Sequence, residues 1–215
     1  MNNPELNMTK IPFCLTRLLL LSLCVLQSVQ ASDYVIDTEG GHAYIQFKIS
    51  HLGFSWLTGR FNRFSGSFSY DEKDPSSATV EVVIDTTSID TNHAERDKHL
   101  RDEDYLHVDT FPEARFVSSA FEEQGGGKAK LIGELTLRGI TRPIQIDVEH
   151  VGAGTDPWGG YRRGFSGSTR LVLAEFGITK YLGDAAKTME LSLGIEGIRK
   201  KSQHRPRKPG GQRLR

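Results

Sequence analysis

A run of histidines and acids in the middle of the chain holds the side chains best suited to chemistry. It opens with His93-Ala94-Glu95, and His99 follows. The His-x-Glu pattern occurs in zinc deaminases, which also need a Pro-Cys-x-x-Cys motif. Both cysteines of this chain, Cys14 and Cys24, lie near its start. His93 and His99 are not three or four residues apart, so one helical face does not present both well. We therefore expect no metal site here.

Acid–base catalysis is a second chemistry to consider for the segment from His93 to Asp104. It would need two carboxylates with well separated pKa values, whereas a run of mixed charge is typical of a solvated helix with surface ion pairs. The sequence has neither a Gly-x-Ser-x-Gly elbow nor a phosphate-binding loop. One alternative hypothesis stays open. In it, the protein is an enzyme or redox accessory that uses this segment on a small hydrophobic substrate.

The same segment is the one stretch predicted to be helical. Thr91 or Asn92 can cap a helix, and Glu95 in the first turn favours the helix dipole. Everywhere else between Tyr34 and Gly197 the chain alternates apolar and polar residues, which is typical of half-buried antiparallel strands. The alternating stretches are 43–49, 64–70, 80–84, 131–137, 144–148, 165–173 and 189–195.

These elements predict an all-β fold, a closed antiparallel barrel of about eight strands with one short helical insertion. Closure removes exposed sheet edges, and a barrel of this size holds either its own side chains or one small ligand. Gly66, Gly133 and Gly167 lie within strands on the apolar face, where they suit either barrel bends and ligand space or ordinary bulges. Core packing accounts for most aromatics, including the cluster around Phe54 and Trp56, and a lipophilic pocket is the other explanation.

The chain divides into three parts. Residues 1–31 have a basic start, an apolar run and small residues at Val29-Gln30-Ala31, so we expect a signal peptide cleaved after Ala31 and export to the periplasm. Residues 32–198 then form one barrel domain without cysteine. Its 17 basic and 26 acidic residues give a net charge of −9, which argues against a nucleic-acid partner. Residues 199–215 carry eight Lys or Arg and no acid, so we expect a disordered tail that can contact a membrane surface.

In this order and over this length, several motifs make the chain resemble the YceI-like polyisoprenoid-binding family, in its exported, lipocalin-like, UPF0312-type branch. The motifs run through the domain from residue 33 to residue 198 and are Tyr34-Val35-Ile36-Asp37, His51-Leu52-Gly53-Phe54-Ser55-Trp56, Asp90-Thr91-Asn92-His93-Ala94-Glu95-Arg96-Asp97-Lys98-His99-Leu100-Arg101, Phe111-Pro112-Glu113-Ala114-Arg115-Phe116, Gly133-Glu134-Leu135-Thr136-Leu137-Arg138-Gly139-Ile140-Thr141-Arg142-Pro143 and Asp156-Pro157-Trp158-Gly159-Gly160. The resemblance implies an eight-stranded antiparallel lipocalin-like barrel, with a long hydrophobic pocket for an isoprenoid chain, a quinone or a polyprenyl phosphate. It also implies a link to stress responses and, in some members, a homodimer.

The resulting hypothesis is a non-enzymatic periplasmic carrier of a polyisoprenoid lipid, with no other cofactor and no metal. Inward-facing apolar residues are expected to contact the lipid: Ile45, Phe47, Phe64, Phe68, Val82, Phe116, Leu135, Ile146, Phe165, Leu171 and Leu193. The headgroup is expected near the Arg96–Arg101 segment or the loop around Trp158. A further alternative is a barrel filled by its own side chains, with a partner protein on its outer surface.

Overall fold

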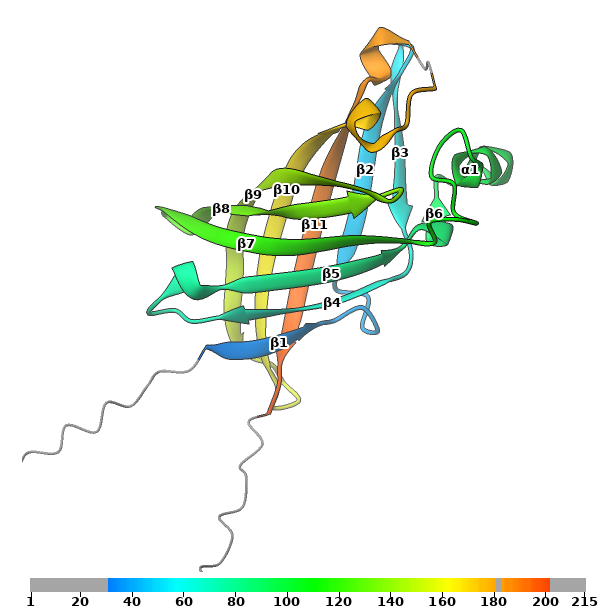
Figure 1. The fold of residues 1–215 in the computed structure, drawn as a ribbon. Coiled ribbons are helices and arrows are strands. Elements are labelled where there is room, and N and C mark those ends of the chain that lie inside the picture. Colours follow the sequence, from blue (N-terminus) through cyan, green and yellow to red (C-terminus); the bar gives the residue numbers. More distant parts are fainter. Residues whose placement is uncertain (1–30, 181–182, 202–215) are drawn as a thin grey trace, which may run out of the picture.

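A closed antiparallel barrel dominates the computed structural model, which describes residues 31–180 and 183–201 (Figure 1). The predicted fold class, an all-β barrel of eight strands with one short helix, is confirmed. Among the described residues no helix is both long and apolar enough to span a bilayer. The strands are β1 (Ser32–Ile36), β2 (Tyr44–His51), β3 (Ser55–Phe61), β4 (Phe64–Tyr70), β5 (Thr79–Asp85), β6 (Ile89–Asp90), β7 (Glu113–Gly125), β8 (Lys128–Leu137), β9 (Ile140–Thr155), β10 (Tyr161–Val172) and β11 (Thr188–Arg199). The α-helix is α1 (Ala94–Arg101), and four 3-10 helices are η1 (Pro75–Ser77), η2 (Thr86–Ser88), η3 (Leu173–Phe176) and η4 (Asp184–Ala186).

The barrel strands follow the order β1-β4-β5-β7-β8-β9-β10-β11, and pairing between β1 and β11 closes the ring. In Figure 1, β1, β4, β5 and β7 cross in front of β9, β10 and β11. The strand β11 also pairs with β2, and the sheet then continues through β3 to β6. Eight strands therefore form the closed barrel, while β2, β3 and β6 extend one of its walls.

One edge of β11 is shared between two partners. Its C-terminal part pairs with β1, from Tyr34 opposite Arg199 to Ile36 opposite Gly197. Its N-terminal part pairs with β2, from Gly194 opposite Tyr44 to Met189 opposite Ile49. The barrel thus closes tightly at the β1 end and widens at the β2 end.

Aromatic side chains fill the β1 end of the barrel. Tyr34 and Phe68 stack with ring centroids 4.7 Å apart, and Phe165 meets Phe68 edge-on at 5.7 Å. Tyr70 contacts Phe165 at 5.5 Å and Phe121 at 6.0 Å. Aromatic rings bury large apolar areas, so this packing supplies much of the core. A cavity of only about 70 Å³ remains among these rings.

A buried arginine completes the closed end. Arg163 is only 4% exposed, and its guanidinium lies 4.5 Å from the centre of the Tyr70 ring. It forms an ion pair with Glu72 and donates to Nε2 of His150 at 3.1 Å. Burial, and then the charge of Arg163, lowers the pKa of His150. The resulting neutral imidazole is able to accept that bond.

Glycines within strands make room for aromatic rings of the protein itself. A methyl group at Gly133 would clash with the Phe116 ring and with the carbonyl oxygen of Val117. At Gly167, Ile146 and Leu193 occupy the nearby space at 3.2 and 3.3 Å. Gly133 and Gly167 therefore do not provide space for a ligand, which was one of the interpretations drawn from the sequence.

This packing predicts that Gly133→Ala destabilises the fold by about 1–3 kcal/mol, because the added methyl group must displace a core ring or the β7 backbone. Equilibrium urea unfolding measures the change. Gly152→Ala in β9 is the matched control, since nothing lies within 4 Å of a methyl group there. Its effect should stay within about 0.5 kcal/mol. Equal effects of the two substitutions would contradict the packing account.

Candidate functional site

The wide end of the barrel contains an apolar cavity of about 590 Å³. The C-terminal parts of β8 and β10 and the N-terminal part of β11 supply Leu135, Leu171 and Leu191 to its wall. The extension adds further side chains, including Phe47 from β2 and Leu57 from β3. The cavity therefore lies where the sheet leaves the closed ring, and its lining is mostly hydrocarbon.

Short segments outside the strands complete the lining. Leu173 from η3 and Ala186 from η4 lie at one side, with Ile178 between these helices in sequence. Leu106, which follows α1, contributes from the other side and is itself buried. Strand periodicity included Leu173, at the end of the 165–173 stretch, but gave no sign of Leu106, Ile178 or Ala186, which lie where regular alternation stops. The only available signal was a set of apolar residues in segments otherwise rich in turn formers.

Residues of the helix α1 line one side of the cavity. In Figure 1 the helix lies at the right, next to β6. Its N-cap is His93, whose Nδ1 accepts a hydrogen bond from the Arg96 backbone amide at 3.2 Å. The predicted cap at Thr91 or Asn92 was therefore wrong. Asn92 instead has a positive φ of 58°, which asparagine tolerates better than most residues. This bend sets the direction of the helix.

Three charged side chains tie α1 to the barrel. Asp97 is buried and accepts hydrogen bonds from the backbone amide and the hydroxyl of Thr91, at 2.9 and 2.5 Å. Arg96 donates to the same hydroxyl and to the Thr91 carbonyl at 2.8 and 2.7 Å. Arg101 donates to the carbonyls of Thr87 and Ile89, both at 2.8 Å. The interpretation of this run as a fully solvated helix was wrong for Asp97.

The polar edge of the cavity comes from α1. Its members are His93, Glu95, Arg96 and His99, next to Leu100. The Arg96–Arg101 segment therefore borders the large cavity, while a headgroup beside it stays a prediction. Cations and imidazoles along one edge of an apolar cavity suit a ligand with a long apolar body and one polar end.

Two carboxylates of the His93–Asp104 segment, those of Asp97 and Asp104, have structural partners, and Asp102 contributes to the helix end through its backbone amide. Asp97 holds Thr91, and Asp104 forms a 2.5 Å ion pair with Lys180. Asp102 is the C-cap of α1. A pair of carboxylates facing each other across the cavity, as the acid–base hypothesis needs, does not occur among the described residues of this segment.

The eleven residues proposed to contact lipid fall into three groups. Ile45, Phe47, Leu135 and Leu171 line the large cavity. Phe68, Ile146, Phe165 and Leu193 lie around the small cavity at the closed end. Phe64, Val82 and Phe116 belong to the core and line neither. Contact with a ligand stays a prediction for all of them, and the geometry favours the first four.

Three aromatic residues lie neither in the core nor in the cavity. Phe54 is 86% exposed, Trp56 58% and Trp158 81%. The prediction that packing or a pocket accounts for the Phe54 cluster was wrong for Phe54 and Trp56, whereas Leu57 of the same cluster lines the large cavity. The loop around Trp158 joins β9 to β10 at the closed end, so it is not near the large cavity.

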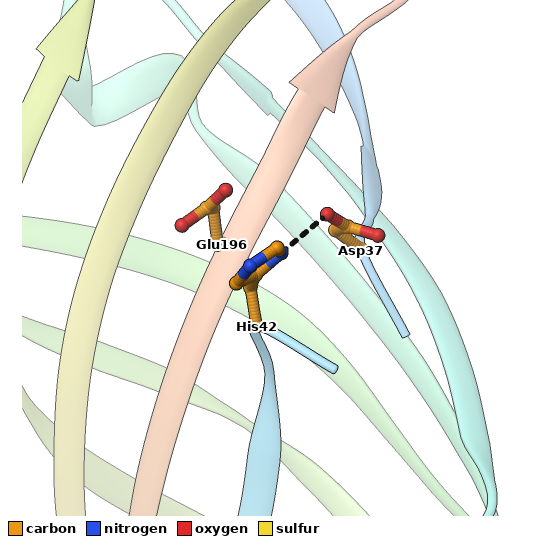
Figure 2. A group of neighbouring side chains, drawn as sticks. All are labelled: Asp37, His42 and Glu196. Atoms are coloured by element: carbon orange, nitrogen blue, oxygen red, sulfur yellow. Dashed lines mark hydrogen bonds and ion pairs between the residues drawn. The ribbon is translucent and has the colours of Figure 1, made fainter. Parts of the chain in front are cut away.

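A second polar cluster lies where β1 ends and β2 begins. Figure 2 shows Asp37, His42 and Glu196, whose possible metal-ligand atoms lie within 4.8 Å of one another. Arg162, however, donates to Asp37 at 2.6 Å, to Glu196 at 2.5 Å and to Asp156 at 2.8 Å. The guanidinium therefore already acts as the cationic partner of all three carboxylates. We interpret the cluster as an ion-pair network.

The electrostatics of this network are strong because Asp37 is buried. The hydrogen bond from His42, followed by that from Arg162, lowers the pKa of Asp37 to about 2. Its other oxygen accepts from the Gly40 amide at 2.8 Å. In turn, the bonds to Asp37, Asp156 and Glu196 raise the pKa of Arg162. The network holds together the chain segments that pair successively with β11.

Comparison with known proteins identifies relatives of this chain in sequence and in fold. The profile of the YceI-like domain matches residues 34–197. UPF0312 protein Sputw3181_1309 of Shewanella sp. (strain W3-18-1) is 51% identical over 186 residues, which cover 86% of this chain and 97% of that protein.

Two solved structures are similar in fold. Burkholderia cenocepacia BcnA superposes with a TM-score of 0.67 at 20% identity, covering 75% of this chain and 98% of BcnA. A domain from Saccharophagus degradans, described as a polyisoprenoid binding domain implicated in plant cell wall breakdown, gives a TM-score of 0.54 at 14% identity. That match covers 80% of this chain and all of that domain.

The Asp37 network predicts an acid-sensitive part of stability. Because the folded-state pKa of Asp37 is depressed from 3.8 to about 2, its contribution is fully present above about pH 4 and is lost as the pH falls towards 2. After allowance for solvent screening we expect about 1–2 kcal/mol. Urea unfolding of the wild type and Asp37→Asn, at pH 6 and at pH 2.5, measures it. The stability gap between the two proteins should shrink at the lower pH. A gap that is the same at both pH values would contradict the assignment.

Proposed function

The chain belongs to the YceI-like domain family, and from that premise we propose that it is a periplasmic, non-enzymatic binding protein for a polyisoprenoid lipid. The observation that carries the proposal is the apolar cavity of about 590 Å³ at the wide end of the barrel. The lipid's hydrocarbon tail occupies this cavity, and its headgroup lies at the polar edge formed by α1.

The energetics of the cavity support a hydrocarbon occupant. Each buried methylene contributes roughly 0.8 kcal/mol, so a few isoprene units supply ample gross affinity. Ordering the tail and bringing two molecules together oppose much of that gain. A long apolar chain is therefore better suited than a small polar metabolite, which would lose hydrogen bonds to water without replacing them.

The polar edge indicates what the headgroup offers. Arg96 and His99 border the cavity and carry N–H donors, and Glu95 directly precedes Arg96 in sequence. A quinone carbonyl or a polyprenyl phosphate oxygen accepts hydrogen bonds from such donors. The name of the Saccharophagus degradans domain agrees with an isoprenoid tail, although that likeness by itself concerns the fold.

Export explains why such a carrier would be needed. The predicted signal peptide lies in residues 1–31, almost wholly outside the described residues, and the described domain holds no cysteine. An isoprenoid cannot cross an aqueous compartment unless its tail is covered, and the barrel provides that cover. Dimer formation, a role in stress responses and membrane contact through the basic residues 199–215 stay predictions.

Filling the cavity should abolish lipid binding. Ala114 on β7 lines the cavity and is buried, so Ala114→Phe puts a ring where the tail lies. We expect at least about a tenfold loss of bound isoprenoid, with folding retained because an existing void is filled. Mass spectrometry of organic extracts, before and after incubation with an isoprenoid quinone, measures the bound lipid.

The matched control is Ala153→Phe, on the exposed end of β9 away from the cavity. It should bind lipid as the wild type does. Wild-type extracts without isoprenoid from several expression hosts, together with no uptake of added quinone, would overturn the proposed function. Chemical conversion of the bound quinone that His99→Ala abolishes would favour the enzymatic alternative instead.

A further inference from the structure

An exposed apolar tip stands beside the mouth of the cavity. The tip comprises the turn between β2 and β3 and the first two residues of β3. The exposed fractions of its side chains are 55% for Leu52, 86% for Phe54 and 58% for Trp56. Leu52 also lines the cavity, so the tip and the cavity form one continuous apolar surface. In Figure 1, β2 and β3 rise to the top of the molecule, and the described ends of the chain lie at the bottom.

The turn itself uses an unfavourable residue. Phe54 donates its amide to the His51 carbonyl at 2.9 Å, and the two central residues both have positive φ, 55° at Leu52 and 81° at Gly53. Asparagine, aspartate or glycine is favoured at the first of these positions, and leucine is strained there. Since Leu52 is more than half exposed, core packing does not account for it. Strain of this kind is an observation that points to a functional role.

The charge around the tip is also unusual for this acidic domain. No Asp or Glu occurs between Glu39 and Asp71, although residues 32–198 contain 26 acids. Lys48 lies 4.4 Å from the centre of the Trp56 ring, and its ion pair with Glu190 at 2.9 Å leaves the base of the hairpin neutral. Arg170 pairs with the same Glu190 carboxylate, so these three side chains carry no net negative charge and do not repel lipid phosphates.

From these three observations we propose that the β2–β3 tip inserts into the headgroup region of a lipid bilayer and opens the cavity directly onto it. This inference rests on the proposed function, because a polyisoprenoid is stored in membranes and must be taken up from one. Tryptophan and phenylalanine are favoured at the membrane interface. A second copy of the chain is a poorer occupant, since a stable dimer buries about 600 Å² or more on each partner and a three-residue tip offers less.

The chain contains two tryptophans, one at each end of the barrel, which allows a matched experiment. Trp158→Phe leaves Trp56 at the tip as the single reporter, and Trp56→Phe leaves Trp158 at the closed end. Each protein is mixed with phosphatidylcholine vesicles that contain acyl-brominated lipid. These vesicles carry no net charge, so the basic tail has little electrostatic attraction to them. We expect a blue shift and quenching of Trp56 fluorescence and neither effect for Trp158.

Phe54→Ser in the Trp158→Phe background tests the tip further. It removes an exposed side chain and should weaken vesicle partitioning about tenfold while leaving unfolding unchanged. No quenching of Trp56, equal quenching of both reporters, or a Trp56 shift that depends on protein concentration without vesicles would each overturn the proposal. The last result would assign the tip to self-association. The vesicles hold no isoprenoid, so the absence of vesicle binding would not contradict the proposed function. Conversely, if no isoprenoid is found in organic extracts of the protein, insertion of the tip can still be measured with these vesicles.

Discussion

The division of one strand edge between two partners is the constraint on which the rest of the structure depends. β11 pairs with β1 along its C-terminal part and with β2 along its N-terminal part. A closed ring must fill its interior, so the β1 end packs Tyr34, Phe68 and Phe165 against each other. At the other end, β2 and β3 diverge from the ring, and β3 pairs with the two-residue strand β6. The space opened by this divergence is the cavity, and α1 covers its side.

Two glycines and an ion-pair network lie where β11 changes its pairing partner from β2 to β1. Gly194 and Gly197 lie on either side of this change, and a methyl group at either position would clash with Tyr44 or Phe68. Asp37 follows β1, and its backbone amide donates to the Glu196 carbonyl at 2.8 Å, which extends the β1 pairing by one residue. Arg162 then joins Asp37 to Glu196. Gly197 therefore leaves space for the buried Phe68 ring, Gly194 leaves space for the exposed Tyr44 ring, and an ion-pair network holds the seam.

Sequence periodicity predicted the fold well and the site only in part, for a physical reason. Alternation shows which face of a strand is buried, but it carries no information on position along the barrel axis. Phe47 and Phe68 have the same pattern around them, yet one lines the large cavity and the other fills the closed end. Phe54 and Trp56 were assigned to core or pocket because composition alone does not show that a hairpin extends beyond the barrel. The helix was predictable from its charges, whereas the burial of Asp97 depends on its long-range docking onto Thr91.

The two ends of the barrel also give the lipid of the proposed function a direction. Arg163, Tyr70 and Phe165 close one end, so a tail cannot pass through the molecule. The donors that suit a headgroup lie on α1, beside the mouth, and not at the bottom of the cavity. A lipid that enters tail first can therefore place its polar end where water and α1 both reach it. The same geometry lets the tail leave through the mouth by which it entered, next to the apolar tip of the β2–β3 hairpin. Storage and transfer then depend on one opening, and α1, held by Arg96, Asp97 and Arg101, sets its width.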